Sequence, residues 1–237
     1  MVIGGIVAGG TGSRMGNYSV PKQFLLLDEK PIVVHVVEKF LSCTGIDAIV
    51  VGVHKDWYQY MMDLKKKYFK DISRVTVVKG GLDRNGTILE IMKAAEEQYH
   101  LTDDDILVTH DAVRPFVSFR IIQDNIEAAK KYHVCDTVVG ATDTIVCSEN
   151  GEYITDIPVR QTMFQGQTPQ SFKVGLFKAV YNSMTQEELN VVTDACKMFY
   201  LRNHAVYLVT GDVSNIKITY PFDYKMAQIM MESQRDD

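Results

Sequence analysis

The sequence predicts an α/β protein of three layers, in which helices cover both faces of a mainly parallel sheet. Short apolar runs, at residues 2–8, 48–53 and 106–109, have the length and composition of buried parallel strands. Segments with apolar residues at helical spacing separate these runs, and such alternation is typical of βαβ units. The 237 residues suffice for one large domain, and no linker rich in Pro, Gly or Ser divides them. We therefore expect a single domain spanning residues 1–237.

The first strand leads into a glycine-rich turn, G-G-T-G, at residues 9–12. Glycines let backbone N–H groups converge on a phosphate, because no Cβ blocks the approach. Arg14 and Lys22 add two positive charges beside this turn. An ordinary tight turn, or the turn of a dinucleotide-binding domain, would share the glycines. Pro21, however, interrupts the helix that a dinucleotide-binding turn enters, and the two cations suit a triphosphate.

The next elements repeat the alternation of helix and strand. Pro31 suits the first position of a helix through residue 41, and the strand at residues 48–53 follows it. Asp56 would cap a second helix through residue 68. A third strand over residues 74–79 then completes this half of the sheet.

A second glycine pair, at residues 80–81, follows that third strand. The polar segment 82–87 enters another helix, which Asp83 or Asn85 would cap. Capping groups and their neighbouring N–H donors can also bind a base or a ribose, so the two roles are compatible.

The fourth strand, residues 106–109, runs into the segment H-D-A-V-R-P. Asp111 is therefore expected at the carboxyl end of a central strand, where open α/β sheets bind ligands. Its carboxylate could bind Mg²⁺ or accept hydrogen bonds from substrate hydroxyls. An internal ion pair between Asp111 and Arg114, three residues apart, explains the same pattern nearly as well.

Beyond residue 120 the alternation is less regular. A helix over residues 121–132 and a strand over 137–140 precede a hairpin pattern at residues 143–157. Such a hairpin is either an arm that packs on another subunit or an antiparallel extension of the sheet edge. The segment 165–172 is so rich in side-chain amides that we expect a polar loop outside the core.

The C-terminal part is predicted to hold two helices, over residues 174–183 and from about residue 193, and a strand over 206–209. A short last strand over residues 215–219 places Lys217 between apolar neighbours. A lysine on a buried strand needs a partner for its charge, and a bound phosphate would supply one. A final helix begins at Pro221.

Composition excludes several classes of function. The net charge of −5 and the pI near 5.7 argue against a general nucleic-acid binder. The four cysteines are scattered without metal-ligand spacing, as expected for buried thiols in a reducing compartment. No basic segment precedes the first apolar run, and no run approaches membrane-spanning length, so we expect a cytoplasmic protein.

Eight short motifs occur in order over nearly the whole chain: G-G-T-G-S-R, P-K-Q, G-G-x-D-R, H-D-A-V-R-P, D-T, R-x₇-T-P-Q, T-D-A and N-I-K-I-T. In this set the chain resembles the cytidylyltransferase family that includes the 2-C-methyl-D-erythritol 4-phosphate and ribitol-5-phosphate cytidylyltransferases. The resemblance implies a Rossmann-like nucleotidyltransferase fold with a protruding β-arm at about residues 141–160. It also implies CTP, Mg²⁺ and a polyol phosphate as ligands, and a homodimer formed through the arm.

Three details are similar to the ribitol-5-phosphate branch: the loop F-Q-G-Q-T-P-Q-S-F, the segment T-D-A-C-K, and the continuation D-R-N-G-T-I. They make D-ribitol 5-phosphate the first expected acceptor, giving CDP-ribitol, a teichoic acid precursor. The methylerythritol branch more typically has T-D-E, and a serine where this chain has Thr87. The enzyme of that branch, which serves isoprenoid precursor synthesis, is the alternative expectation.

The resemblance assigns a role to each matching residue. Four cations would be catalytic: Arg14, Lys22, Arg160 and Lys217. The CTP pocket would consist of Val7, Ala8, Gly9, Gly10, Gly81, Leu82, Asp83, Arg84, Asn85, Gly86, Thr87 and Ala112. The acceptor site would include Asp111, Arg114, Thr144 and Thr168, and Asp111 would also be the metal ligand.

The residue types suit the transfer of a nucleotidyl group. A phosphate monoester is already nucleophilic at neutral pH, so the protein has only to position the anions and neutralise developing charge. A nicotinamide-dependent oxidoreductase is the rival from another class, but it would need an acidic residue or an arginine after the second strand, where the chain has H-K-D. A regulatory relative that only binds nucleotide, and an enzyme that uses another nucleotide, are the further alternatives.

Overall fold

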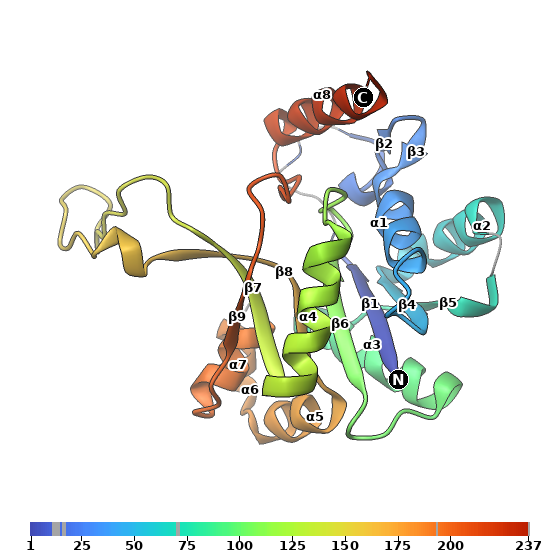
Figure 1. The fold of residues 1–237 in the computed structure, drawn as a ribbon, viewed down its shortest axis with the longest axis horizontal. Coiled ribbons are helices and arrows are strands. Elements are labelled where there is room, and N and C mark those ends of the chain that lie inside the picture. The colour runs from blue at the N-terminus through green and yellow to red at the C-terminus, as the bar shows by residue number, and fades with distance from the viewer. Residues whose placement is uncertain (11–14, 16–17, 70–71, 193, 237) are drawn as a thin grey trace.

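The computed structural model describes residues 1–10, 15, 18–69, 72–192 and 194–236. Within these residues the chain forms a seven-stranded sheet of order β5-β4-β1-β6-β8-β7-β9 (Figure 1). Only β8 runs antiparallel to its neighbours, so the expected three-layer, mainly parallel α/β architecture is confirmed. The strands are β1 (Val2–Ala8), β4 (Ala48–Val53), β5 (Val75–Lys79), β6 (Ile106–Asp111), β7 (Val134–Gly140), β8 (Phe164–Lys173) and β9 (Tyr207–Thr210).

Helices cover both faces of the sheet with separate apolar cores. On one face the buried side chains come from α1 (Ile32–Leu41), α2 (Tyr58–Tyr68) and α4 (Phe119–Tyr132). On the other they come from α3 (Arg84–Tyr99), α5 (Val174–Ser183) and α7 (Ala195–Leu201). The short α6 (Gln186–Val191) lies between α5 and α7 in sequence. No helix among the described residues is long and apolar enough to cross a membrane.

A third, smaller core lies beside the carboxyl end of β6. It joins the C-terminal helix α8 (Pro221–Asp236) to a two-stranded hairpin of β2 (Leu26–Leu27) and β3 (Lys30–Pro31), as Figure 1 shows. Ile218 belongs to this core, and its amide donates to the carbonyl of Val113. The C-terminal segment is thereby held against the loop that follows β6.

The prediction of a polar loop at residues 165–172 is wrong, because this segment lies in strand β8, in the interior of the sheet. Its residues from Gln167 to Phe172 are all buried. Amides are tolerated there because they pair inside the protein: Gln167 Nε2 donates to the carbonyl of Asp212, and Gln170 Nε2 to the carboxylates of Asp136 and Asp194. Buried polar groups that are paired in this way cost little, although Gln170 Oε1 has no partner among the described residues.

Two other expected strand segments are irregular. Residues 215–219 form no strand, because the chain there makes single backbone contacts rather than a ladder. The hairpin pattern at 143–157 has one antiparallel bridge, between Cys147 and Asp156, and no regular strand. The β2–β3 hairpin and α6 were not predicted from the sequence, although Thr185 and Glu188 form a capping box that marks the start of α6.

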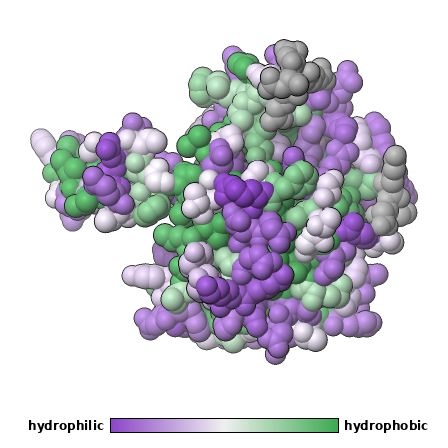
Figure 2. Space-filling model, in the orientation of Figure 1, coloured by the Kyte–Doolittle hydropathy of each residue, from purple (hydrophilic) through white to green (hydrophobic). Residues whose placement is uncertain are grey.

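The segment between β7 and β8 projects from the body of the protein (Figure 1). We call residues 141–163 the arm. It carries exposed apolar side chains, seen as green atoms on the projection in Figure 2. They include Val146, Tyr153, Ile154, Ile157 and Val159.

Candidate active site

A cavity of about 380 Å³ opens where the carboxyl ends of β1 and β6 meet the start of α3. Gly9 and Gly10 of the first glycine turn and Gly81 of the second border it, as expected for a ligand site of an open α/β sheet. Of the expected CTP-binding residues, most line this cavity: Val7, Ala8, Gly9, Gly10, Gly81, Leu82, Asp83, Arg84, Thr87 and Ala112. Lys22, Asp111 and Lys217 line it as well.

Close packing around Thr87 explains one glycine in each of the two turns, Gly9 and Gly80. A Cβ on Gly9 would lie 3.0 Å from Thr87 Oγ1, and one on Gly80 would lie 2.8 Å from the same atom. Thr87 Oγ1 donates to the carbonyl of Asp83, whose carboxylate caps α3 by accepting from Gly86 N at 2.7 Å. The expected helix cap by Asp83 is therefore confirmed, and the two turns are held at a fixed spacing.

Gln23, next to Lys22 in the chain, is hydrogen-bonded to the first glycine turn. Both lie in the 3-10 helix η2 (Lys22–Phe24) and are buried, although Lys22 also borders the cavity. Gln23 Nε2 donates to the carbonyls of Ala8 and Gly10, at 2.7 and 2.8 Å. Gln23 was not selected from the sequence, although its place in P-K-Q, directly after a candidate phosphate ligand, was a usable signal. Arg14 lies outside the described residues.

Asp111 lies among three cations. Lys217 Nζ is 2.8 Å from Oδ2, Arg84 Nε is 3.3 Å from Oδ1, and Arg114 Nε is 4.0 Å from Oδ2. Burial alone would raise the pKa of Asp111, but Arg84, Lys217 and Arg114 hold that pKa well below its ordinary value. The carboxylate therefore stays ionised, and the group as a whole has an excess of positive charge. The ion pair with Arg114, considered from the sequence, is present but is the longest of the three.

This arrangement does not provide a protein cage for Mg²⁺. A magnesium ion in a nucleotide site is usually bound by one or two carboxylates together with phosphates. Asp83 and Asp111 are the carboxylates that border the cavity within the described part of the chain, and both are engaged. Asp83 Oδ1 accepts from Gly86 N, and both oxygens of Asp111 face cations. In the expected role of Asp111 as metal ligand, a magnesium ion would compete with these cations for the carboxylate.

Thr168 forms hydrogen bonds with the backbone amide of Asp111 and with the side chain of His110. Asp111 N donates to Thr168 Oγ1 at 3.2 Å, and His110 Nε2 lies 3.0 Å from the carbonyl of Arg114. A carbonyl only accepts, so His110 carries its proton on Nε2, and Nδ1 accepts from the Thr168 hydroxyl at 2.9 Å. Burial lowers the pKa of His110 to about 4, which keeps the ring neutral. The Thr168 hydroxyl is therefore used inside the protein, and Thr168 does not line the cavity.

The remaining expected site residues lie outside the cavity lining. Arg114 is buried and donates to the carbonyl of Asn215, and Asn85 donates to the carbonyl of Val192. Gly86 contributes the capped amide at the start of α3. Thr144 and Arg160 belong to the arm, where Arg160 donates to the carbonyl of Thr142.

His54 lines the cavity, although from the sequence it was expected to be only a polar residue at a strand end. It lies directly after β4, so its placement follows from the parallel order of β1 and β4. Val113 also borders the cavity and was not selected. An apolar residue between Asp111 and Arg114 gives no signal of its own in the sequence.

A mainly parallel three-layer sheet whose glycine turns and cations enclose a cavity at the strand ends is the arrangement of a nucleotidyltransferase, and this chain is one. More specifically, it belongs to the IspD family, described as 2-C-methyl-D-erythritol 4-phosphate cytidylyltransferase, whose sequence profile matches residues 2–233.

Solved structures of similar proteins agree with the fold. The 4-diphosphocytidyl-2C-methyl-D-erythritol synthase of Anaerococcus prevotii has a TM-score of 0.80 at 26% identity, over 98% of this chain and 96% of that one. The 2-C-methyl-D-erythritol 4-phosphate cytidylyltransferase of Francisella tularensis has a TM-score of 0.78 at 24% identity, over 96% and 98%. The corresponding Thermus thermophilus enzyme has a TM-score of 0.75 at 21% identity, over 97% and 98%.

Proposed function

We propose that the protein transfers the cytidylyl group of CTP to a phosphorylated polyol and releases pyrophosphate. The observation that carries this proposal is the family match over residues 2–233. The cavity supports it, because Lys22, Arg84 and Lys217 give it the positive charge that two phosphorylated substrates need. Enzymes of this family generally use divalent cations, and the triphosphate would supply the principal oxygens for such an ion.

The family match favours 2-C-methyl-D-erythritol 4-phosphate as the acceptor. The names of the similar solved enzymes point the same way. This reverses the order expected from the sequence motifs, in which ribitol 5-phosphate came first. Both acceptors are short polyols that end in a phosphate, so the same cations would serve either one.

Ribitol 5-phosphate, and with it a role in teichoic acid synthesis, is the second candidate because of Ala195. This residue of the T-D-A-C-K segment is fully buried in the apolar core beneath α7. A glutamate at this position, as in the T-D-E pattern, would bring a carboxylate into that core at a considerable cost. The packing around this position therefore suits an alanine, as in the T-D-A pattern that resembles the ribitol branch.

In the proposed reaction, an oxygen of the acceptor phosphate attacks the α-phosphorus of CTP in line. One P–O bond forms as the bond to the bridging oxygen breaks, and pyrophosphate leaves with that electron pair. No side chain has to remove a proton. Lys22, beside the glycine turn, would stabilise charge on the CTP phosphates, and Arg14 would assist it. Lys217 would hold the acceptor phosphate, while Asp111 accepts from the acceptor hydroxyls.

A homodimer would complete the acceptor site. Arg160 and Thr144, both expected to contact the acceptor, lie on the arm and not in the cavity lining of their own chain. Ile154, Ile157 and Val159 expose apolar surface on the same arm. Exposed apolar side chains gathered on a projection favour packing on a second subunit. We therefore propose that the arm brings Arg160 into the partner's cavity.

A ligand-induced shift of the melting temperature tests the nucleotide part of the proposal. CTP with Mg²⁺ is expected to raise the melting temperature in proportion to ln(1 + [CTP]/Kd). NADH, the ligand of the rival oxidoreductase, is expected to leave it unchanged. A shift with NADH and none with CTP would reject the cytidylyltransferase assignment.

A further inference from the structure

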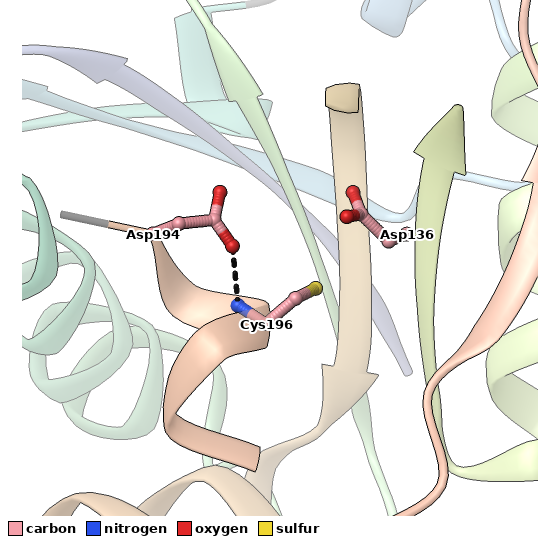
Figure 3. Close-up of side chains that lie close together, drawn as sticks. All are labelled: Asp136, Asp194 and Cys196. Atoms are coloured by element: carbon pink, nitrogen blue, oxygen red, sulfur yellow. Dashed lines mark hydrogen bonds between the residues drawn. The ribbon is translucent and has the colours of Figure 1, made fainter. Parts of the chain in front are cut away.

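A second cluster of ligating side chains lies where β7 and β8 meet the start of α7. Asp136 projects from β7, Asp194 is the N-cap of α7, and Cys196 lies in the first turn of that helix (Figure 3). One carboxylate oxygen of each aspartate and the sulfur of Cys196 all lie within 4.8 Å of one another. The proposed reaction uses none of these three residues.

An unpartnered amide oxygen belongs to a glutamine whose nitrogen contacts the same cluster. Gln170 of β8 is 1% exposed, and its Nε2 donates to Asp136 Oδ1 at 3.0 Å and to Asp194 Oδ2 at 2.7 Å. Its Oε1 is buried without a hydrogen-bond partner among the described residues. A buried amide oxygen without a hydrogen-bond partner is unfavourable, and a ligand that engages it would remove that cost.

We propose that this cluster binds a divalent transition-metal ion of the zinc class. The ligands would be one oxygen each of Asp136 and Asp194, the thiolate of Cys196 and Oε1 of Gln170. Half a turn of the Gln170 amide exchanges Nε2 and Oε1, and an oxygen can face two ionised carboxylates only when a cation lies between them. The resulting set of one sulfur and three oxygens offers tetrahedral coordination.

The dimensions of the cluster are close to those of a bound site. Ligand atoms at about 2.0 and 2.3 Å from one tetrahedral ion lie roughly 3.5 Å apart. Because the atoms of the cluster lie within 4.8 Å of one another, the ligands have to close by little more than 1 Å. The thiol of Cys196 makes only a weak bond at present, with Sγ 3.8 Å from the carbonyl oxygen of Cys135, so it gives up little on binding.

An ion can reach the cluster from solvent. Asp136, Asp194 and Cys196 border an open cavity of about 680 Å³, whose wall also includes Tyr200 and His204. This cavity and the nucleotide cavity have no lining residue in common within the described part of the chain. The inferred site is therefore distinct from the reaction site, and the sulfur ligand selects against Mg²⁺.

Cobalt binding to the full-length protein tests the inference. After treatment with a chelator, titration with Co²⁺ should give one ion per chain, with d–d absorption and a thiolate-to-cobalt charge-transfer band. Cys196→Ser should abolish the charge-transfer band. Cys147→Ser, at an exposed thiol on the arm, is the matched control and should retain it. Zn²⁺ should displace the cobalt, and Mg²⁺ at the same concentration should not.

A thermal assay keeps the inference testable if Cys196→Ser folds poorly. Zn²⁺ should raise the melting temperature of the wild type and of Cys147→Ser, but not that of Asp194→Asn. Asparagine is as good an N-cap as aspartate, so that variant keeps α7 intact. The inference is overturned if the wild type shows no charge-transfer band, or if Cys196→Ser or Asp194→Asn binds the ions as the wild type does.

Discussion

Lys217 and Asp111 form an ion pair, with Lys217 Nζ 2.8 Å from Asp111 Oδ2, that links the C-terminal segment to the end of β6. The lysine selected from the sequence as a phosphate ligand thus already has a carboxylate as its partner. That carboxylate also faces Arg84 and Arg114. Lys217 could therefore turn toward a phosphate without leaving the charge of Asp111 uncompensated.

We expect Lys217→Ala to raise the KM for the acceptor and to leave the KM for CTP nearly unchanged. The physical reason is that a contact made in the ground state contributes to substrate binding, and its loss appears in KM. Stability should change by only about 1 kcal/mol, because Lys217 is 41% exposed and Arg84 remains beside Asp111. Steady-state kinetics and urea unfolding measure the two effects.

The matched control for that variant is Lys130→Ala, which removes a surface lysine paired with Glu127 on α4. It should alter neither KM. If Lys217→Ala lowers stability while the acceptor KM stays at the wild-type value, Lys217 has only a structural role.

Thr168→Val should destabilise the protein by roughly 1–3 kcal/mol. The substitution removes the hydroxyl that bridges His110 Nδ1 and Asp111 N, and it leaves both groups buried without a partner. Thr168→Ser keeps the hydroxyl and should retain most of the stability. Equal unfolding free energies for the wild type and Thr168→Val would mean that the hydroxyl serves the substrate alone.

The neutral state of His110 predicts a loss of stability in mild acid. Its pKa is lowered by burial from 6.5 to about 4, so the unfolded chain takes up a proton first as the pH falls. The stability that this residue contributes is complete above pH 6.5 and is lost between about pH 6.5 and pH 4. The full loss is roughly 3 kcal/mol.

The titration of Asp136 changes the stability in the opposite direction over the same pH range. Burial, and to a smaller extent the charge of Asp194, raises the pKa of Asp136 to about 7, although the hydrogen bond from Gln170 opposes the shift. The folded state therefore gains stability as the pH falls below 7. The comparison of wild type with His110→Gln cancels this contribution. In metal-free buffer the wild type should lose stability relative to that variant from pH 6.5 to 4. A difference that does not vary with pH would contradict the assignment.

The parallel half of the sheet was predictable because its strands are short, mainly apolar runs, and two of them, β1 and β5, end in glycine turns. The same turns placed most of the expected CTP-binding residues beside one cavity. β8 was missed because its polar side chains are satisfied by residues distant in sequence, such as Asp194 and Asp212, which no local pattern reveals. For the same reason, the sequence did not show that the Thr168 hydroxyl is hydrogen-bonded inside the protein, because its partners lie on β6.

We expect Arg160 to act on the cavity of the partner subunit. Lys22→Ala and Arg160→Ala should each be inactive alone, but their heterodimer combines one altered cavity with one intact cavity. Mixing the two proteins should then restore activity in heterodimers. Subunit exchange is confirmed separately, for example with two affinity tags. No recovery after confirmed exchange would place both residues in the site of a single chain.

Pyrophosphate release from CTP and Mg²⁺ tests the central claim most directly. The protein alone should release none. Addition of 2-C-methyl-D-erythritol 4-phosphate or ribitol 5-phosphate should start release, with the former giving the higher kcat/KM if the family match identifies the acceptor. A higher kcat/KM with ribitol 5-phosphate would reverse the acceptor assignment and leave the reaction class in place. No release with either acceptor, from protein that binds CTP, would contradict the account.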